Sequence, residues 1–295
     1  MILLTGSSGF LGRYLFNNLP AKIIKTLNRS SSDYEVDLSV NMPCFTDKFD
    51  IVIHNAGKAH LVPKSQEDIK AFWDVNVIGT INLLNALEAQ PPKYFVFISS
   101  VAVYGLHYGS EIDDLCDLKS NDPYGKSKIE AEVIVKNWCF KNNVICTILR
   151  LPLVVGENPP GNLRAMIYGI KKGYYFNIAG GNAKRSMVLA SDIAKFILKA
   201  AEVGGTYNLT DGYHPNFNEL SHCIAQQINR NYVPNIPMFI ARIFAIVGDK
   251  IGHKFPINSD KLNKITSTLT FDDSKAREAF GWNPTQVIKG FKIHK

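Results

Sequence analysis

A tyrosine and a lysine lie four residues apart in the segment Tyr124-Gly-Lys-Ser-Lys128. On a helix, residues at this spacing share one face, so the two side chains can act on one substrate. A tyrosine hydroxyl, with a pKa near ~10, is a weak base at neutral pH, and an adjacent ammonium group favours its phenolate. The pair therefore predicts proton exchange with a substrate hydroxyl or carbonyl. Many surface helices carry such a pair by chance, so it needs support from the rest of the chain.

Ser100 supplies a third polar group. It follows an apolar segment, 94–98, that predicts a buried strand. In parallel α/β sheets, ligands bind at the carboxyl ends of the strands. We therefore expect the Ser100 hydroxyl to polarise the same substrate oxygen on which Tyr124 acts.

A glycine-rich segment at the start of the chain predicts a dinucleotide site. Thr5-Gly6-Ser7-Ser8-Gly9-Phe10-Leu11-Gly12 joins a predicted strand over 2–4 to a predicted helix over 10–19. Gly6 permits a tight turn, Gly9 lets the backbone approach a pyrophosphate, and Gly12 lets the helix pack closely on the sheet. The alternative is a glycine-rich turn without a ligand, which this spacing disfavours. The expected cofactor contacts are Gly6, Ser8, Gly9, Phe10, Leu11 and Gly12.

The end of the second predicted strand, 23–27, bears on the choice between NAD and NADP. An acidic residue there would bind the ribose 2′-hydroxyl of NAD, but the strand continues as Asn28-Arg29-Ser30. Arg29 suits the 2′-phosphate of NADP. Alternatively, Arg29 is solvated and Asn28 holds the ribose of NAD. Both cofactors stay open, with a lean towards NADP; Asp37 and Leu38 either flank the adenine or belong to a solvated loop.

Strands and helices alternate through the first half of the chain. This pattern predicts an α/β fold, a Rossmann-type doubly wound parallel sheet, with a smaller C-terminal substrate lobe. Pro and Gly residues break the alternation after Arg150. We expect residues 1–152 plus about 186–212 to form the dinucleotide-binding domain, and about 153–185 plus 213–295 the second, substrate-binding lobe. Further strands are predicted over 49–54, 144–149 and 206–209. Helices are predicted over 65–89, either as one helix or with a successor starting after Asn76, and over 123–142, the last capped by Asn121 or Asp122.

Composition narrows the classes of function. The net charge of +7 suits phosphorylated substrates, and without a dense Lys/Arg run nucleic acid is not expected as a partner. The five cysteines form no Cys-x-x-Cys pair, so we expect no metal and free thiols in a reducing cytoplasm. A predicted strand at residue 2 leaves no room for a signal peptide. The most apolar stretch, 238–247, is about half of the ~20 residues that span a bilayer; we expect it to pack in the second lobe or against a partner.

Taken together, these motifs resemble the extended short-chain dehydrogenases/reductases of the nucleotide-sugar epimerase/dehydratase group. The resemblance covers nearly the whole chain. Its motifs are the Gly6–Gly12 loop, His54-Asn55-Ala56-Gly57, Asn76-Val77-Ile78-Gly79-Thr80, Ser99-Ser100-Val101-Ala102-Val103-Tyr104-Gly105, Tyr124-x-x-x-Lys128, Arg150-x-Pro152-Leu153-Val154-Val155-Gly156 and Phe280-Gly281-Trp282-Asn283-Pro284.

The resemblance implies a role for each matching residue. Ser100, Tyr124 and Lys128 would form the catalytic triad, with Lys128 also holding the nicotinamide ribose. Asn162 and Arg185 would contact the nucleotide-sugar, Arg185 at its diphosphate or its nucleoside; from the residues alone, a loop turn and a surface salt bridge are the simpler interpretations. Relatives often form homodimers through the segments 65–89 and 123–142. The remaining implied contacts are Asn55, Ala56, Gly57 and Asn76 for the cofactor and Lys58 for the substrate.

One departure from the family pattern narrows the reaction. Dehydratases of the group carry Asp-Glu after the catalytic Ser, where this chain has Val101 and Ala102. Neither can remove water from a sugar, which leaves oxidoreduction at C4 by a 4-epimerase or a 4-ketoreductase using NAD or NADP. The Ala56-Gly57-Lys58-Ala59-His60 stretch resembles enzymes acting on UDP-N-acetylhexosamines in polysaccharide precursor synthesis. The alternatives are a reductase of a non-nucleotide carbonyl and a catalytically silent NADP-binding protein.

Overall fold

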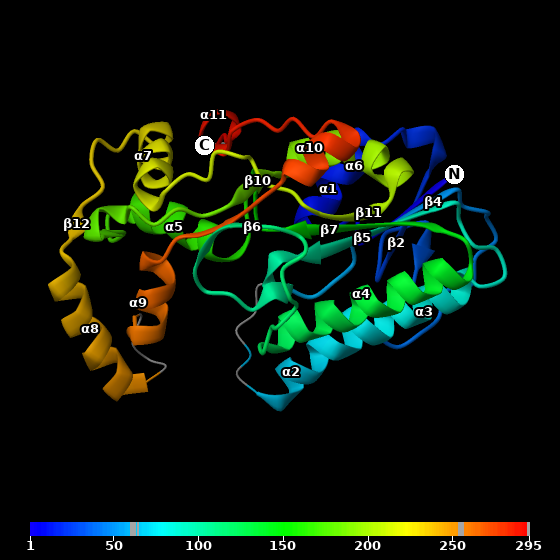
Figure 1. Ribbon diagram of the computed structural model, residues 1–295, viewed down its shortest axis with the longest axis horizontal. Helices are drawn as coiled ribbons and strands as arrows, with labels where there is room; N and C mark the ends of the chain where they lie inside the picture. The colour runs from blue at the N-terminus through cyan, green and yellow to red at the C-terminus, as the bar shows by residue number, and fades with distance from the viewer. Residues whose placement is uncertain (60–62, 64, 253–256, 294–295) are drawn as a thin grey trace.

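A seven-stranded parallel sheet forms the centre of the molecule in the computed structural model (Figure 1). The structure describes residues 1–59, 63, 65–252 and 257–293, so His60 of the 56–60 stretch lies outside the described residues. The strand order is β11-β7-β5-β4-β1-β2-β3. The order reverses between β1 and β4, which creates a crevice at their carboxyl ends where ligands bind in such sheets. The strands are β1 (Ile2–Thr5), β2 (Ile24–Asn28), β3 (Tyr34–Glu35), β4 (Ile51–His54), β5 (Tyr94–Ser100), β7 (Ile145–Leu151) and β11 (Gly205–Asn208).

Helices cover both faces of this sheet. On one face lie α1 (Phe10–Asn18) and α6 (Ala190–Val203), and on the other α3 (Gly79–Leu87) and α4 (Pro123–Lys141). The strand side chains alternate between the two cores: Val96 packs with the first pair of helices, and Phe95 and Phe97 with the second. Strands buried on both faces need apolar residues throughout, which is the pattern that the sequence shows. The predicted fold class is therefore confirmed.

The predicted helix over 65–89 is interrupted. It consists of α2 (Gln66–Trp73), a π-helical turn at Asp74–Ile78, and α3. Ser65 caps its start, with its side chain accepting a hydrogen bond from the Asp68 N–H. A π turn inside an α-helix frequently marks a functional site, and this one contains Asn76. At the start of α4 the cap is Asp122, whose Oδ1 accepts from the Gly125 N–H at 3.0 Å.

The second half of the chain contributes helices and short strand pairs beyond the sheet. Apart from α6, the helices are α5 (Gly161–Lys172), α7 (Phe217–Gln227), α8 (Met238–Ile251), α9 (Ser259–Thr266), α10 (Ser274–Phe280) and α11 (Val287–Gly290). The parallel pairs are β8 (Leu153–Val155) with β10 (Met187–Leu189), β9 (Asn177–Ile178) with β12 (Asn235–Ile236), and β6 (Gly109–Ile112) with β13 (Leu269–Phe271). These pairs were not predicted, because strands of two to four residues carry too little periodicity to detect. The bounds given for the two domains stay a prediction.

Three 3₁₀ turns complete the described elements: Ala21–Ile23, Val101–Tyr104 and Ala179–Gly181. Within the described residues, no helix is long and apolar enough to cross a membrane. The same part of the chain holds no cluster of three His, Cys, Asp or Glu side chains that could bind a metal ion. The five cysteines are free thiols.

Candidate active site

The glycine loop has the close backbone contacts that its spacing predicts. Gly6 has a φ of +68°, and a Cβ atom there would lie 2.8 Å from the Ala56 backbone. A Cβ on Gly12 would lie 2.0 Å from the carbonyl oxygen of Gly6. A Cβ on Gly9 would lie 3.2 Å from the same oxygen. Gly6 and Gly12 are therefore required by the fold, whereas Gly9 is required less strictly.

The loop delivers unpaired backbone donors at the start of α1. The Gly9 N–H bonds to the Gly6 carbonyl, and the first bond of the helix runs from Arg13 to Gly9. Within the described chain, the N–H groups of Phe10, Leu11 and Gly12 have no acceptor, and the first turn holds no acidic side chain. Such donors, with the positive end of the helix dipole, suit a phosphate anion. The residues present therefore fit the pyrophosphate of a dinucleotide.

Two residues from the end of β2 differ in their environment. The Asn28 amide donates to the Ser7 hydroxyl at 2.8 Å and accepts from the Ser8 N–H at 3.4 Å, which ties it to the glycine loop. Arg29 is exposed and forms no hydrogen bond to a described residue, although its charge contributes to lowering the pKa of Asp37. A guanidinium left in solvent beside the loop suits a 2′-phosphate.

Asp37 and Leu38 are held by the protein itself. The Asp37 carboxylate accepts from the Ser39 hydroxyl at 2.6 Å and the Ser39 N–H at 3.0 Å. Leu38 is buried, and its side chain lies beside Gly79 of α3. Their predicted contact with adenine stays a prediction.

The segment after β4 lies against the glycine loop. The Asn55 amide donates to the Gly6 carbonyl at 3.0 Å, and the Thr5 hydroxyl accepts from the N–H groups of both Asn55 and Ala56. Buried His54 bridges Thr5 and Thr80, at 2.8 and 3.0 Å. Burial, with a smaller effect of the Lys128 charge, lowers the pKa of His54 to about 3. His54 is therefore neutral and fixes the crevice rather than exchanging protons.

Asn76 fastens the segment after β4 to α4. Its Oδ1 accepts from the Lys58 N–H at 2.8 Å, while its Nδ2 donates to the Lys58 carbonyl and to the Ser127 hydroxyl. Ser127 in turn donates to the carbonyl of Tyr124 at 2.7 Å. Asn76 therefore holds the Lys58 backbone and helix α4 in place by hydrogen bonds. The predicted contacts of Asn76 with the cofactor and of Lys58 with the substrate stay predictions.

Tyr124 and Ser100 meet at the end of β5. The Ser100 side chain lies close enough to influence the pKa of Tyr124, and the Tyr124 ring lies 5.9 Å from that of Phe72. Burial raises the pKa of Tyr124 above its ordinary value, and the neighbouring Ser100 side chain opposes this only in part. The hydroxyl is therefore protonated at neutral pH, which suits donation of a proton to a ketone oxygen. The expectation of a pKa lowered by Lys128 was wrong: the pKa is raised by burial, and Lys128 is not among the groups that shift it.

Lys128 contacts β5 and lies close to Gly57 in the segment after β4. Its Nζ donates to the Ile98 carbonyl at 2.7 Å and lies 4.4 Å from the centre of the Phe97 ring. It also lies 3.6 Å from the position of a Cβ atom on Gly57, so glycine keeps this side open. Burial lowers the pKa of Lys128 to about 8, and the charge of Glu132 raises it in part. One of three ammonium donors is engaged by Ile98, which leaves donors for a ribose hydroxyl.

A buried ion pair behind Lys128 was missed from the sequence. Arg150 donates to both carboxylate oxygens of Glu132, at 3.1 and 2.8 Å, and Ser99 donates to the same carboxylate at 2.5 Å. Arg150 also bonds to the Tyr104 hydroxyl. The available signal was spacing: Glu132 stands four residues after Lys128 and so lies on the buried face of α4.

Arg185 and Asn162 lie in the second half of the chain. The Arg185 guanidinium donates to the Lys264 carbonyl at the end of α9, and burial lowers its pKa. No described carboxylate pairs with it, so it suits an anionic ligand. Asn162 is exposed in the first turn of α5. No described contact links either residue to Tyr124, and their substrate roles stay predictions.

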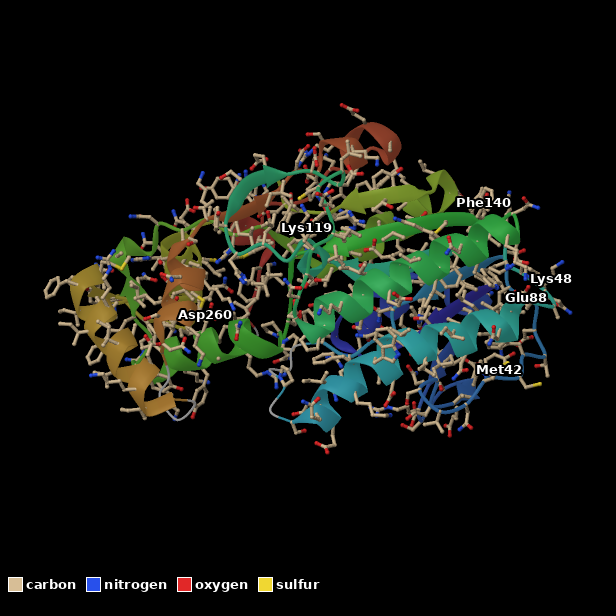
Figure 2. All side chains as sticks on the ribbon, turned by 60° about the horizontal axis from the view of Figure 1, so that its bottom comes forward. Met42, Lys48, Glu88, Lys119, Phe140 and Asp260 are labelled. Atoms are coloured by element: carbon tan, nitrogen blue, oxygen red, sulfur yellow. The ribbon has the colours of Figure 1, made fainter. Side chains whose placement is uncertain are left out.

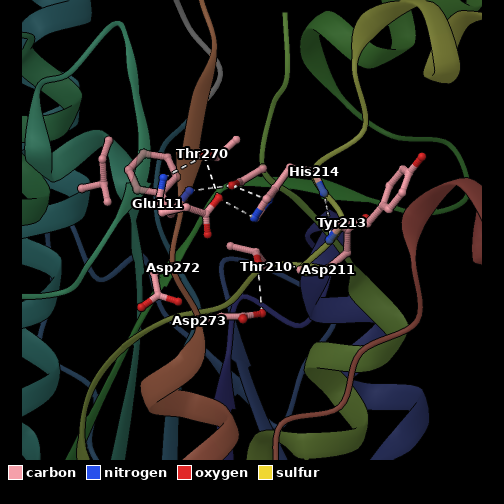
Figure 3. Close-up of polar contacts among 12 residues, drawn as sticks. Glu111, Thr210, Asp211, Tyr213, His214, Thr270, Asp272 and Asp273 are labelled. Carbon is pink, nitrogen blue, oxygen red and sulfur yellow. Dashed lines mark hydrogen bonds and ion pairs between the residues drawn. The ribbon is translucent and has the colours of Figure 1, made fainter.

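A polar junction holds the strand ends beside Arg185 (Figure 3). The Ser186 hydroxyl lies 3.0 Å from Nδ1 of His214 and accepts from the Phe271 N–H. Nε2 of His214 lies 3.3 Å from Glu111, whose carboxylate accepts from Thr270. The order Ser-His-Glu is that of a hydrolase triad, but Ser186 is only 4% exposed. The junction is therefore structural: it joins β6, β10 and β13.

Comparisons with known proteins agree with this geometry. The model of the NAD dependent epimerase/dehydratase family matches residues 2–210. An N-acetyl-alpha-D-glucosaminyl-diphospho-ditrans,octacis-undecaprenol 4-epimerase of Escherichia coli O157:H7 is 29% identical, over 98% of this chain and 92% of its own. A UDP-glucose 4-epimerase of Vibrio cholerae is 26% identical, over 99% and 93%. The solved UDP-Glc/GlcNAc 4-epimerase of Campylobacter jejuni superposes with a TM-score of 0.74 at 19% identity, covering 97% of this chain and 94% of that one.

Fold and crevice define a dinucleotide-binding α/β enzyme. The chain belongs to the NAD-dependent epimerase/dehydratase family. It is an enzyme of the nucleotide-sugar epimerase kind and binds NAD or NADP, as the resemblance of its motifs implied.

Proposed function

We propose that the enzyme catalyses oxidoreduction at C4 of a sugar carried on a nucleoside diphosphate, as a UDP-sugar 4-epimerase. The observation that carries the proposal is that Tyr124 lies beside Ser100 at the carboxyl end of β5, where Lys128 of the same helix bonds to the Ile98 carbonyl. The UDP-glucose 4-epimerase relative supports the choice of reaction. Val101 and Ala102 supply no acid or base, which disfavours dehydration.

Each catalytic residue has one task at C4. Tyr124 exchanges the proton of the O4 hydroxyl, Ser100 donates a hydrogen bond to the same oxygen, and Lys128 holds a ribose hydroxyl of the cofactor. A nicotinamide held there would supply reversible hydride transfer at C4. For an epimerase, the 4-keto sugar would turn over before it is reduced, so that C4 is inverted, and Tyr124 would return to O4 the proton that it took. Arg185 holds the diphosphate, and Asn162 contacts the nucleotide-sugar.

A one-way 4-ketoreductase using NADP is the second candidate. Two observations favour it: Arg29 is free to meet a 2′-phosphate, and the raised pKa of Tyr124 keeps a proton ready for a ketone oxygen. In either case the sugar diphosphate can end in a nucleoside or, as in the name of the Escherichia coli relative, in a polyprenol. A role in polysaccharide precursor synthesis, a cytoplasmic location and a homodimer through α2, α3 and α4 accompany the proposal as predictions.

The test follows the sugar by NMR. The wild-type protein is incubated with UDP-N-acetylglucosamine and UDP-glucose, and C4 inversion is recorded without added cofactor; oxidation of NADPH by a UDP-4-keto sugar is recorded in parallel. Tyr124→Phe is expected to abolish both signals while dinucleotide binding changes little. Tyr168→Phe, on the exposed side of α5, is the matched control and retains activity. Full turnover by Tyr124→Phe refutes the mechanism. C4 inversion without added cofactor identifies a 4-epimerase, whereas oxidation of NADPH by the 4-keto sugar identifies a 4-ketoreductase.

A further inference from the structure

Helix α8 is apolar beyond the stripe that it buries. Its small residues Ala241, Ala245 and Gly248 are buried, and the two alanines pack with Leu262 of α9. The rest of its surface carries large apolar side chains that are 39% to 65% exposed. They are Phe239, Ile243, Phe244, Ile246, Val247 and Ile251, and we call them the outward face.

A helix on the surface of a globular protein normally has polar side chains on the side that faces solvent. Six large apolar side chains on one helix instead indicate a contact surface. The helix lies at the edge of the second half of the chain, with α9 on its inner side (Figure 1). Figure 2 shows it at the end of the molecule opposite Phe140 of α4. No described element covers its outward face.

The charges around the outward face identify its occupant. Arg242 and Lys250 are exposed on the same helix and form no ion pair with a described residue. Of the nearby acids, Asp260 pairs with Lys264 at 2.8 Å. Asp249 accepts from the neutral Ser259 hydroxyl and N–H and keeps its negative charge, so α8 holds two cations and one anion on a chain of net charge +7. The excess of positive charge fits an anionic partner.

Length determines how such a helix meets a membrane. The 14 residues of α8 extend about 21 Å, short of the ~30 Å hydrocarbon core. Apolar side chains on one side, with flanking Arg and Lys, are the properties of a helix that lies in the plane of the interface. Lys250 can extend its alkyl chain along the apolar face and reach the headgroups with its ammonium.

We propose that the outward face of α8 docks on an anionic phospholipid bilayer, with Arg242 and Lys250 at the headgroups. The docking places the site near the membrane, because α9 connects α8 to Arg185: Leu262 packs against α8, and the Lys264 carbonyl accepts from Arg185. That consequence rests on the proposed function, since it takes Arg185 as the diphosphate contact. The docking itself stands without it.

Sedimentation with vesicles tests the proposal on the full chain. The wild-type protein is expected to sediment with vesicles of phosphatidylcholine and phosphatidylglycerol, weakly with phosphatidylcholine alone, and less as salt rises. Phe239→Ser with Ile243→Ser should weaken binding at least about tenfold, since each substitution removes a large apolar side chain that the bilayer would bury. Arg242→Gln with Lys250→Gln, which leaves the packing intact, should remove the preference for phosphatidylglycerol. Phe140→Ser, the control, changes an 88% exposed side chain on α4 and should bind as the wild type.

Three outcomes overturn the proposal. They are no sedimentation of the wild-type protein, equal sedimentation of the Phe239/Ile243 variant, and a dimer in solution that this variant disrupts in the absence of vesicles, which assigns the face to a second copy. Turnover of a soluble UDP-sugar is measured on the same variants and should be unchanged. Sedimentation without any turnover would refute the proposed function and leave the docking in place.

Discussion

Replacement of Lys128 by methionine should stabilise the free enzyme while it removes activity. The Lys128 side chain is 5% exposed, and burial lowers its pKa from 10.5 to about 8. At about 1.36 kcal/mol for each pKa unit, this fall corresponds to about 3 kcal/mol of unfavourable free energy for the charged form in the folded protein. Methionine fills a similar volume without a charge. Loss of the hydrogen bond to Ile98 costs about 1 kcal/mol, so a net gain of about 2 kcal/mol is expected at pH 7.

The pH dependence of unfolding isolates this effect. Between the folded pKa of about 8 and the unfolded value of 10.5, the unfolded chain binds one more proton at Lys128 than the folded protein does. Stability therefore rises with pH across this window, and the contribution is lost as pH falls through about 8. Other groups titrate there too, so the wild type and Lys128→Met are compared by urea unfolding between pH 7 and pH 9.5. The difference between the two free energies of unfolding should shrink as pH rises.

Two results would refute this reasoning. One is a variant less stable than the wild type at pH 7, which would mean that the bond to Ile98 and the contact with Phe97 outweigh desolvation. The other is a difference in stability that stays constant with pH, which would mean that Lys128 does not titrate in this range. Activity is measured alongside. Turnover should be lost and dinucleotide binding weakened, because Lys128 is proposed to hold a ribose hydroxyl of the cofactor at the active site.

Three further predictions concern residues around the site. Gly12→Ala should destabilise the protein by at least ~2 kcal/mol and abolish dinucleotide binding, because its Cβ would lie 2.0 Å from the Gly6 oxygen, whereas Gly9→Ala, with its nearest contact at 3.2 Å, should be milder in both thermal unfolding and cofactor titration. Glu132→Ala should cost about 3–5 kcal/mol in urea unfolding by leaving the Arg150 charge buried and unpaired, and the double variant with Arg150→Met should recover most of that loss; equal destabilisation of the single and double variants would contradict the ion-pair account. Arg29→Ala should weaken NADPH binding about tenfold and leave NADH binding unchanged, and equal losses for both cofactors would remove the assignment to NADP.

The sequence predicted the elements whose signal is local. Strands β1, β4, β5 and β7 are apolar runs ended by small or polar residues, and their positions agree with the structure within two residues. The helix α4 was predictable because Asp122 caps it and Pro123 starts it. The glycine loop was predictable for a different reason: Gly6 and Gly12 are required by contacts as close as 2.0 Å, so their spacing carries the geometry.

The features that could not be predicted depend on contacts between distant segments. The pairing of Glu132 with Arg150 joins a helix to a strand, and each residue taken alone is an ordinary charged side chain. The direction of the Tyr124 pKa was also beyond the sequence, because it depends on burial by neighbours such as Phe72, and spacing predicted only the nearby ammonium. The polar junction at Ser186 and His214 joins residues separated by up to 159 positions, so no local pattern marks it.

These pKa directions bear on what Lys128 contributes to the reaction. Its ammonium is bonded to Ile98, and burial raises the pKa of Tyr124, so Tyr124 keeps its proton. A site in this state can protonate a ketone oxygen at once, but it must lose a proton before it can oxidise a hydroxyl. An oxidised nicotinamide held there would carry a positive charge that favours this loss, and a reduced one would not. Tyr124 would then be ready to accept a proton when the cofactor can accept hydride, and to donate one when the cofactor can donate hydride.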